Sequence, residues 1–146
     1  MLRINTILIP TDFSPQAQVA MDGGCMMAAR FGAEVHLLNV IPEPARLVSS
    51  VLADFFPEGF PQEMAEVADK QLAALPASAC GAGTVTRVVL TGDPAHVIVD
   101  YARTHGIDLI VMGTHGHTGV VHALLGSVAE KVVRLAQCAV LTIRSP

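Results

Sequence analysis

Five short apolar segments alternate with helical patterns along this chain, and that alternation restricts the fold more than any other feature of the sequence. The segments are rich in Val, Ile and Leu and lie at 4–9, 35–41, 85–90, 108–112 and 139–143. Between them, apolar residues recur at three- and four-residue spacing, as on the buried face of an amphipathic helix. Strands that alternate with helices build a parallel sheet with right-handed crossovers. The sequence therefore predicts an α/β fold with an open, doubly wound, five-stranded parallel sheet and helices on both faces.

Two of the helical patterns begin with a clear start signal. Ser14-Pro15 and Asp93-Pro94 each place a residue that can cap a helix N-terminus before a proline at the first helical position. Two further helices are expected, one over 62–75 and one that begins at Gly126-Ser127. The start signals place a helix directly after the first strand and directly after the third.

The composition agrees with one domain that covers residues 1–146. The apolar fraction is 51% and the mean hydropathy is +0.50, yet no apolar run approaches the ~18 residues of a membrane span. High apolarity without a span is typical of a sheet that is buried on both faces. We therefore expect a single domain that makes no contact with a membrane.

Charge and cysteine content indicate the surroundings of the protein. The net charge is −4, which disfavours binding to a nucleic-acid backbone. The first residues lack the long apolar stretch and the cleavage site of a signal peptide. The three cysteines, Cys25, Cys80 and Cys138, form no CxxC pair, so a reducing cytosol is the simplest interpretation. We expect a cytoplasmic protein that does not bind nucleic acid.

A glycine-rich loop joins the fourth apolar segment to the last helix. Gly113 and Gly116 follow the strand, and Gly126-Ser127 opens the helix. A strand, a glycine loop and a helix N-terminus together suit a phosphate group, because the backbone can approach closely and its N–H groups and the helix dipole favour negative charge. The spacing G-x2-G-x9-G-S is neither GxGxxG nor a P-loop, and it lacks the P-loop lysine. Glycines in such a position can also serve the turn alone.

That glycine spacing resembles the ATP-binding branch of the universal stress protein family. Further motifs extend the resemblance over nearly the whole chain and lie at 7–14, 37–40, 92–95, 113–134 and 138–143. The resemblance implies an adenine nucleotide alpha hydrolase-like fold, in which the strands have the order 3-2-1-4-5. Ligands of such sheets bind outside the carboxyl ends of the strands, where the strand order reverses. The loops at 10–14 and 113–127 would meet there.

The resemblance also implies which residues bind the nucleotide. Asp12 and the backbone at Val40 would contact adenine, and the glycine loop would hold the ribose, the phosphates and Mg²⁺. The implied set is Pro10, Thr11, Asp12, Val40, Met112, Gly113, Gly116, His117, Gly126, Ser127 and Val128. Two of these residues have an alternative role, since Asp12 could cap the turn before Ser14 and Ser127 could cap the last helix.

Histidines in the glycine loop leave a metal site as an alternative. His115, His117 and His122 lie within eight residues, but no second Cys/His pair braces them, so we expect no metal site. The family more often has arginine where His117 and His122 stand, which leaves this loop with less fixed positive charge for ATP. We interpret the other histidines as surface or strand-edge residues: His36, His96 and His105.

We expect an ATP-binding regulatory or stress-response module. Slow ATP hydrolysis stays open as an alternative, although no lysine or arginine is placed to stabilise a leaving phosphate. A phospho-acceptor receiver domain is excluded, because the third strand ends in Leu90-Thr91-Gly92 and carries no acidic residue there. The last strand, Ala139 to Ile143, is apolar and lies at the sheet edge in the family order. The resemblance therefore implies a homodimer through antiparallel pairing of this strand.

Overall fold

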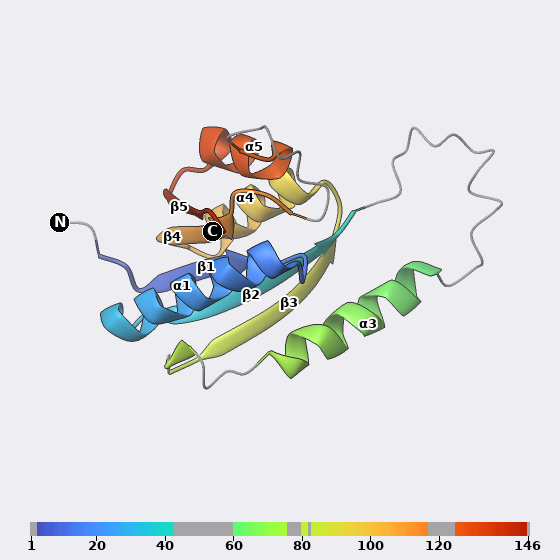
Figure 1. Cartoon of the computed structure of the whole chain (residues 1–146), viewed down its shortest axis with the longest axis horizontal. Helices are drawn as coiled ribbons and strands as arrows, with labels where there is room; N and C mark the ends of the chain where they lie inside the picture. Colours follow the sequence, from blue (N-terminus) through green and yellow to red (C-terminus); the bar gives the residue numbers. More distant parts are fainter. Residues whose placement is uncertain (1–2, 43–59, 76–79, 82, 117–124, 146) are drawn as a thin grey trace.

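Five parallel strands form one sheet at the centre of the structure (Figure 1). The computed structural model describes residues 3–42, 60–75, 80–81, 83–116 and 125–145. The strands are β1 (Thr6–Pro10), β2 (Glu34–Ile41), β3 (Val85–Thr91), β4 (Leu109–Gly113) and β5 (Ala139–Ile143). Their order is β3-β2-β1-β4-β5, and all the strand pairs are parallel, which confirms the expected topology.

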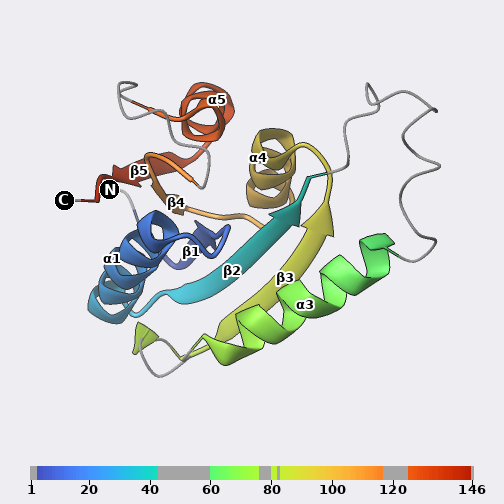
Figure 2. The same cartoon turned by 45° about the vertical axis from the view of Figure 1, so that its right-hand side comes forward.

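Helices cover both faces of the sheet, as expected (Figure 2). They are α1 (Pro15–Phe31), α3 (Phe60–Ala74), α4 (Pro94–Thr104) and α5 (Ser127–Leu135). One core cluster joins β1 to α1 and α3 through residues such as Ile9 and Leu72. A second cluster joins β1 to α4 and α5 through Leu8, Ile98 and Val132. Successive residues of β1 thus enter opposite cores, because side chains alternate along a strand.

Local signals set the helix starts as the sequence predicts. Ser14 caps α1 by accepting a hydrogen bond from the Ala17 N–H at 3.1 Å, and Asp93 caps α4 by accepting one from the His96 N–H at 3.2 Å. Each cap is followed by proline at the start of the helix. None of the helices within the described residues is long and apolar enough to cross a membrane.

The start of β1 differs slightly from the prediction. The strand begins at Thr6 and not at position 4. The backbone N–H groups of Asn5 and Thr6 donate to the Asp108 carboxylate at 2.7 and 3.1 Å. This side-chain acceptor lies 102 residues or more away in the sequence, so no local pattern could show where the strand begins.

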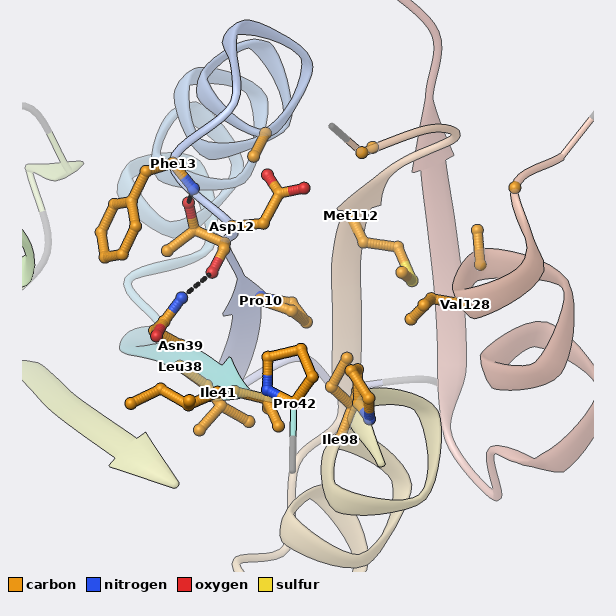
Figure 3. Close-up of a pocket in the computed structure, with 18 of the residues that line it drawn as sticks. Pro10, Asp12, Phe13, Leu38, Asn39, Ile41, Pro42, Ile98, Met112 and Val128 are labelled. Carbon is orange, nitrogen blue, oxygen red and sulfur yellow. Dashed lines mark hydrogen bonds between the residues drawn. The ribbon is translucent and has the colours of Figure 1, made fainter. Parts of the chain in front are cut away.

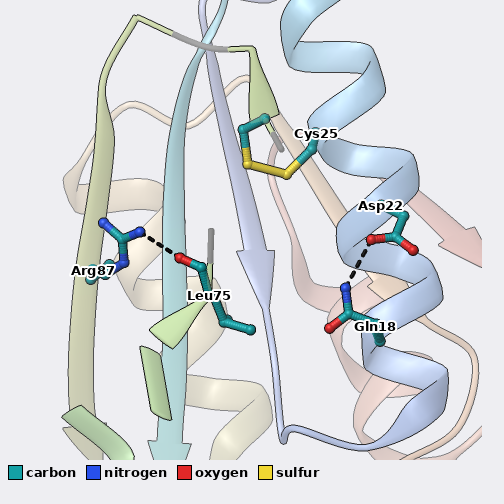
Figure 4. The surroundings of a disulfide bond; sticks show 6 residues. Gln18, Asp22, Cys25, Leu75 and Arg87 are labelled. Carbon is teal, nitrogen blue, oxygen red and sulfur yellow. Dashed lines mark hydrogen bonds between the residues drawn. A yellow bond between two sulfur atoms is a disulfide. The ribbon is translucent and has the colours of Figure 1, made fainter. Parts of the chain in front are cut away.

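A disulfide bond joins Cys25 of α1 to Cys80, which precedes β3 (Figure 4). Both side chains are buried, and 55 residues separate them in the sequence. The spacing of the cysteines predicts no such pair, and the expectation of reduced cysteines is therefore wrong for these two. Cys138 is a free cysteine. The bond ties α1 to the segment that leads into β3.

We predict that reduction of this bond lowers the stability of the protein. A disulfide that closes a loop of 55 residues restricts the unfolded chain, and loss of such a bond typically costs about 2–4 kcal/mol. Thermal unfolding with and without dithiothreitol measures the effect, and the Cys25→Ala/Cys80→Ala double variant should no longer respond to the reductant. Cys138→Ala is the matched control and should respond like the parent. Equal melting temperatures for oxidised and reduced parent protein would contradict the prediction.

Two histidines at the end of the sheet opposite the carboxyl ends of the strands form a cluster with a tyrosine. His36 Nδ1 lies 2.8 Å from the Tyr101 hydroxyl, and the Tyr101 ring stacks on His105 with centroids 3.8 Å apart. Burial, and then the nearby His105, lowers the pKa of His36, while Glu34 opposes this shift. The interpretation of His36 and His105 as ordinary surface or strand-edge residues is therefore incomplete.

This lowered pKa gives a prediction for stability against pH. A histidine in the unfolded chain binds its proton near pH ~6.5, so below that value the unfolded state binds more protons than folded His36 does. His36 therefore contributes stability above that pH, and the contribution is lost as pH falls towards the lowered pKa. Urea unfolding between about pH 7.5 and about pH 5.5 should show a smaller loss of stability for His36→Gln than for the parent. Equal losses for the two proteins would refute this assignment.

Candidate functional site

A cavity of about 850 Å³ opens at the carboxyl ends of β1, β2 and β4 (Figure 3). The strand order reverses between β1 and β4, and this is the position at which open α/β sheets bind ligands. The loop after β1, the glycine loop after β4 and the start of α5 form its walls, together with parts of α3 and α4. The sequence predicts a crevice at this point, and the structure has one there.

Nearly all the residues that the sequence marks as a site lie together on the wall of this cavity. Those on the wall are Pro10, Thr11, Asp12, Val40, Met112, Gly113, Gly116, Gly126, Ser127 and Val128. The remaining one, His117, falls outside the described residues, as does His122. Residues more than 100 positions apart in the sequence therefore share one cavity.

The loop after β1 holds Asp12 in a tight turn. The Ser14 N–H donates to Asp12 Oδ1 at 3.0 Å, and the Phe13 N–H donates to Thr11 Oγ1 at 3.0 Å. Asp12 therefore does form the turn-capping bond that the sequence allows as its alternative role. Phe13 adopts a left-handed backbone conformation with φ 63°, which bulky residues rarely do. Its side chain packs against the core cluster of α1 and α3.

Asp12 also lies beside Gly116, at the start of the glycine loop. A Cβ atom added to Gly116 would overlap Asp12 Oδ2. The Asp12 carboxylate is thus so close to Gly116 that it would have to move if any larger residue stood at this position. The two loops that meet here follow β1 and β4, the two strands on either side of the reversal.

Asn39 of β2 is a buried polar residue beside this loop that sequence reasoning did not assign to the site. Its side chain is 7% exposed, and its Nδ2 donates to the Thr11 carbonyl oxygen at 2.8 Å (Figure 3). The available signal was an amide among apolar residues near the carboxyl end of this strand. The sequence could not show which acceptor the amide meets, because that depends on the pairing of β1 with β2.

The N-terminus of α5 lies on the wall of the cavity. Gly126 is the N-cap residue, and its N–H donates to the Thr114 carbonyl at 2.6 Å. The first N–H that bonds back into the helix belongs to Glu130, which donates to Gly126 O at 2.9 Å. The N–H groups of the first turn have no intrahelical acceptor, and they carry the positive end of the helix dipole. Ser127 is the first helical residue and not the cap, so its alternative role as N-cap is wrong.

The cavity wall carries little fixed positive charge. Its described residues include the ionisable side chains of Asp12, Glu63 and His115 but no lysine or arginine. The sequence from Met112 to Glu130 contains neither residue type. An anion bound here would therefore depend on backbone N–H groups, the helix dipole and any cation that accompanies it.

Helix α3 contributes a wall that sequence reasoning missed. Glu63, Met64, Val67, Ala68 and Gln71 line the cavity. The sequence spaces Met64, Val67, Ala68 and Leu72 as on one apolar face of a helix. Met64 and Val67 are nevertheless 41% and 54% exposed, while Ala68 is buried. Part of the apolar face of α3 therefore borders the cavity and does not cover the sheet.

The structure gives no support to the metal alternative within the residues it describes. Over these ranges, no group of three or more His, Cys, Asp or Glu side chains could hold a metal ion. Of the loop histidines, only His115 is described, and its Nδ1 lies 3.0 Å from the Thr114 hydroxyl.

Comparisons with solved structures place this fold among known proteins. The structure of protein MJ0577 matches with a TM-score of 0.81 and 32% identity, over 99% of this chain and 98% of that one. A universal stress protein in complex with cAMP matches with a TM-score of 0.67 and 24% identity, over 99% of both chains. One from Archaeoglobus fulgidus in complex with dAMP matches with a TM-score of 0.65 and 20% identity, over 98% of this chain and 99% of that one. At these identities the last two similarities concern the fold alone.

Sequence comparisons identify the family. Universal stress protein MJ0531 of Methanocaldococcus jannaschii is 35% identical, over 96% of this chain and 82% of that protein. Universal stress protein YxiE of Bacillus subtilis is 32% identical, over 96% of this chain and 99% of that protein. The family model described as Universal stress protein family matches residues 3–144. With this match over nearly the whole chain, the protein belongs to the universal stress protein family.

Proposed function

We propose that this protein binds ATP with Mg²⁺ in the cavity at the carboxyl ends of β1 and β4 and acts as a nucleotide-dependent regulatory module. One observation carries the proposal: the Asp12 turn faces a glycine loop and the N-terminus of α5 across one cavity. These parts suit the two ends of a nucleotide, a base with hydrogen-bond donors and a negatively charged phosphate chain. The chain forms one domain whose central cavity is the regulatory site.

The adenine ring would lie at the end of the cavity formed by β1 and β2. Apolar side chains there, including Val40, Ile98 and Met112, provide flat contact surface for an aromatic ring. The ionised Asp12 carboxylate accepts hydrogen bonds and donates none, so it suits the 6-amino group of adenine or the ribose hydroxyls. The Val40 backbone would provide a further polar contact at the edge of the ring.

The phosphates would lie against the glycine loop and the start of α5. An added Cβ at Gly126 would come within 3.0 Å of the Thr114 carbonyl, and one at Gly113 within 3.2 Å of the Gln16 carbonyl. Small residues at these positions keep the backbone accessible to phosphate oxygens. The Ser127 hydroxyl can bond a phosphate oxygen or Mg²⁺, and His117 would add an imidazole to the same loop.

Mg²⁺ would offset the charge of the phosphate chain where the wall has no lysine or arginine. Hard oxygen ligands suit this ion, and it keeps most of its bonds to water and phosphate. The same lack of fixed cations on the described wall disfavours rapid phosphoryl transfer, since no such side chain would stabilise the leaving phosphate. We therefore propose binding without rapid turnover.

We predict that the parent protein binds Mg·ATP with roughly micromolar affinity, or about −8 kcal/mol, and that Gly116→Val and Gly126→Val abolish binding. The added side chain at Gly116 would displace the Asp12 carboxylate, and the one at Gly126 would press on the Thr114 carbonyl. Titration calorimetry measures affinity, and circular dichroism confirms that each variant is folded. Gly83→Val is the matched control, since an added Cβ there meets no atom within 4 Å. Parental affinity in folded Gly116→Val and Gly126→Val would disprove the site.

We also propose that two copies of the protein pair through β5. This strand lies at the end of the sheet, with Leu141 partly exposed. The Thr114 N–H donates to the Ile143 carbonyl at 3.0 Å, so the backbone polar groups of Ile143 point towards β4. Because backbone direction alternates along a strand, the N–H groups of Val140 and Thr142 point to the open edge, where a second strand can accept from them.

Val140→Pro tests this pairing, because it removes an outward N–H and leaves the bonds to β4 in place. Light scattering on the eluting protein should show a dimer for the parent and a monomer for Val140→Pro. Val140→Ala is the control, because it loses similar packing and keeps the N–H. A monomeric parent, or a Val140→Pro variant that remains fully dimeric, would rule out this interface.

A further inference from the structure

The backbone of Thr11 is fixed by its neighbour β2. The Thr11 N–H donates to the Leu38 carbonyl at 2.9 Å, and the Thr11 carbonyl accepts from Asn39 Nδ2 at 2.8 Å. Both partners lie in β2, because Pro10 pairs with Leu38 in the parallel register. The Asn39 amide is buried, so water cannot easily replace it as a donor.

The turn that follows Thr11 depends on this anchoring. Phe13 adopts a left-handed backbone conformation that is unfavourable for a bulky side chain. Such a conformation persists only where surrounding bonds enforce it. The Thr11 hydroxyl accepts from the Phe13 N–H, and the Asp12 carboxylate accepts from the Ser14 N–H. Together with the bond from Asn39, these contacts restrict the position of the Asp12 carboxylate in the cavity.

We propose that Asn39 is a positioning residue that makes the site selective for 6-aminopurine nucleotides over 6-oxopurine nucleotides, by fixing Thr11 and hence the carboxylate of Asp12. This inference rests on the proposed function, in which Asp12 accepts a hydrogen bond from the base. Asn39 itself does not need to touch the ligand. Its effect passes through the Thr11 carbonyl to the next residue in the chain.

The selectivity follows from the chemistry of the two base edges. A carboxylate accepts from the 6-amino group of adenine but repels the 6-oxygen of hypoxanthine. Hypoxanthine also carries an N–H at position 1, and a carboxylate free to shift could accept from that group instead. A fixed Asp12 therefore discriminates between the bases, while a loose Asp12 adapts to both.

The experiment compares Mg·ATP with Mg·ITP by titration calorimetry on the full-length protein. The parent should bind ATP about 10–100-fold more tightly than ITP, the effect expected for one hydrogen bond to a charged group. Asn39→Leu keeps the approximate size but removes the donor, and Asn39→Asp replaces the donor with a group that repels the Thr11 carbonyl. In both variants the ratio of the two dissociation constants should fall to within about threefold of unity. Thr11→Val removes the bond to Phe13 and should have the same effect.

Val35→Ala is the matched control for a general loss of stability. Val35 lies in the same strand, is fully buried and stands at the end away from the cavity. This variant should be less stable than the parent but keep the parental ATP-to-ITP ratio. A purely structural role for Asn39 would lower both affinities and leave the ratio unchanged.

The outcomes separate this inference from the proposed function. A parent that binds neither nucleotide overturns the proposed function and this inference with it. A parent that binds both equally, or folded Asn39→Leu, Asn39→Asp or Thr11→Val variants that keep the parental ratio, overturn the inference and leave nucleotide binding intact. If the Asn39 variants do not fold, the ratio for Thr11→Val decides.

Discussion

The burial of β1 on both faces is the constraint on which the rest of the structure depends. Ile7, Leu8 and Ile9 are fully inaccessible, because α1 covers one face of this strand and α4 and α5 cover the other. Its two neighbours in the sheet are β2 and β4; the chain runs from β1 to β2 on one side and from β4 to β5 on the other. The connections that leave the carboxyl ends of β1 and β4 therefore run in opposite directions, and the cavity opens where they separate (Figure 3).

The cavity brings polar backbone and side-chain groups next to the apolar core, and these groups need hydrogen-bond partners. The turn after β1 satisfies its backbone through Thr11, Asp12 and the Asn39 amide, at the cost of a left-handed Phe13. After β4, Gly113, Gly116 and the N-terminus of α5 line the same cavity. The described wall of this cavity carries no lysine or arginine, which supports our proposal of nucleotide binding without rapid turnover.

Local signals in the sequence predict the helices and strands. Features that depend on contacts between distant segments could not be predicted from the sequence. Ser14-Pro15 and Asp93-Pro94 mark helix starts because capping involves neighbouring residues, and the strand order follows from the family resemblance. The pairing of Cys25 with Cys80, the bond from Asn39 to Thr11 and the half-buried His36 depend on segments that meet only in the folded chain. The α3 wall was missed because an apolar stripe does not reveal whether it faces a sheet or a cavity.

Amide NMR spectra of the isotope-labelled protein, recorded during titration with Mg·ATP, test the central claim most directly. This measurement reports both whether the nucleotide binds and where it lies. We predict saturable shifts concentrated at Asp12, Val40, Gly116 and Ser127, with little change at the opposite end of the sheet around His36. Unchanged spectra at millimolar nucleotide, or shifts that cluster away from the carboxyl ends of β1 and β4, would contradict the account.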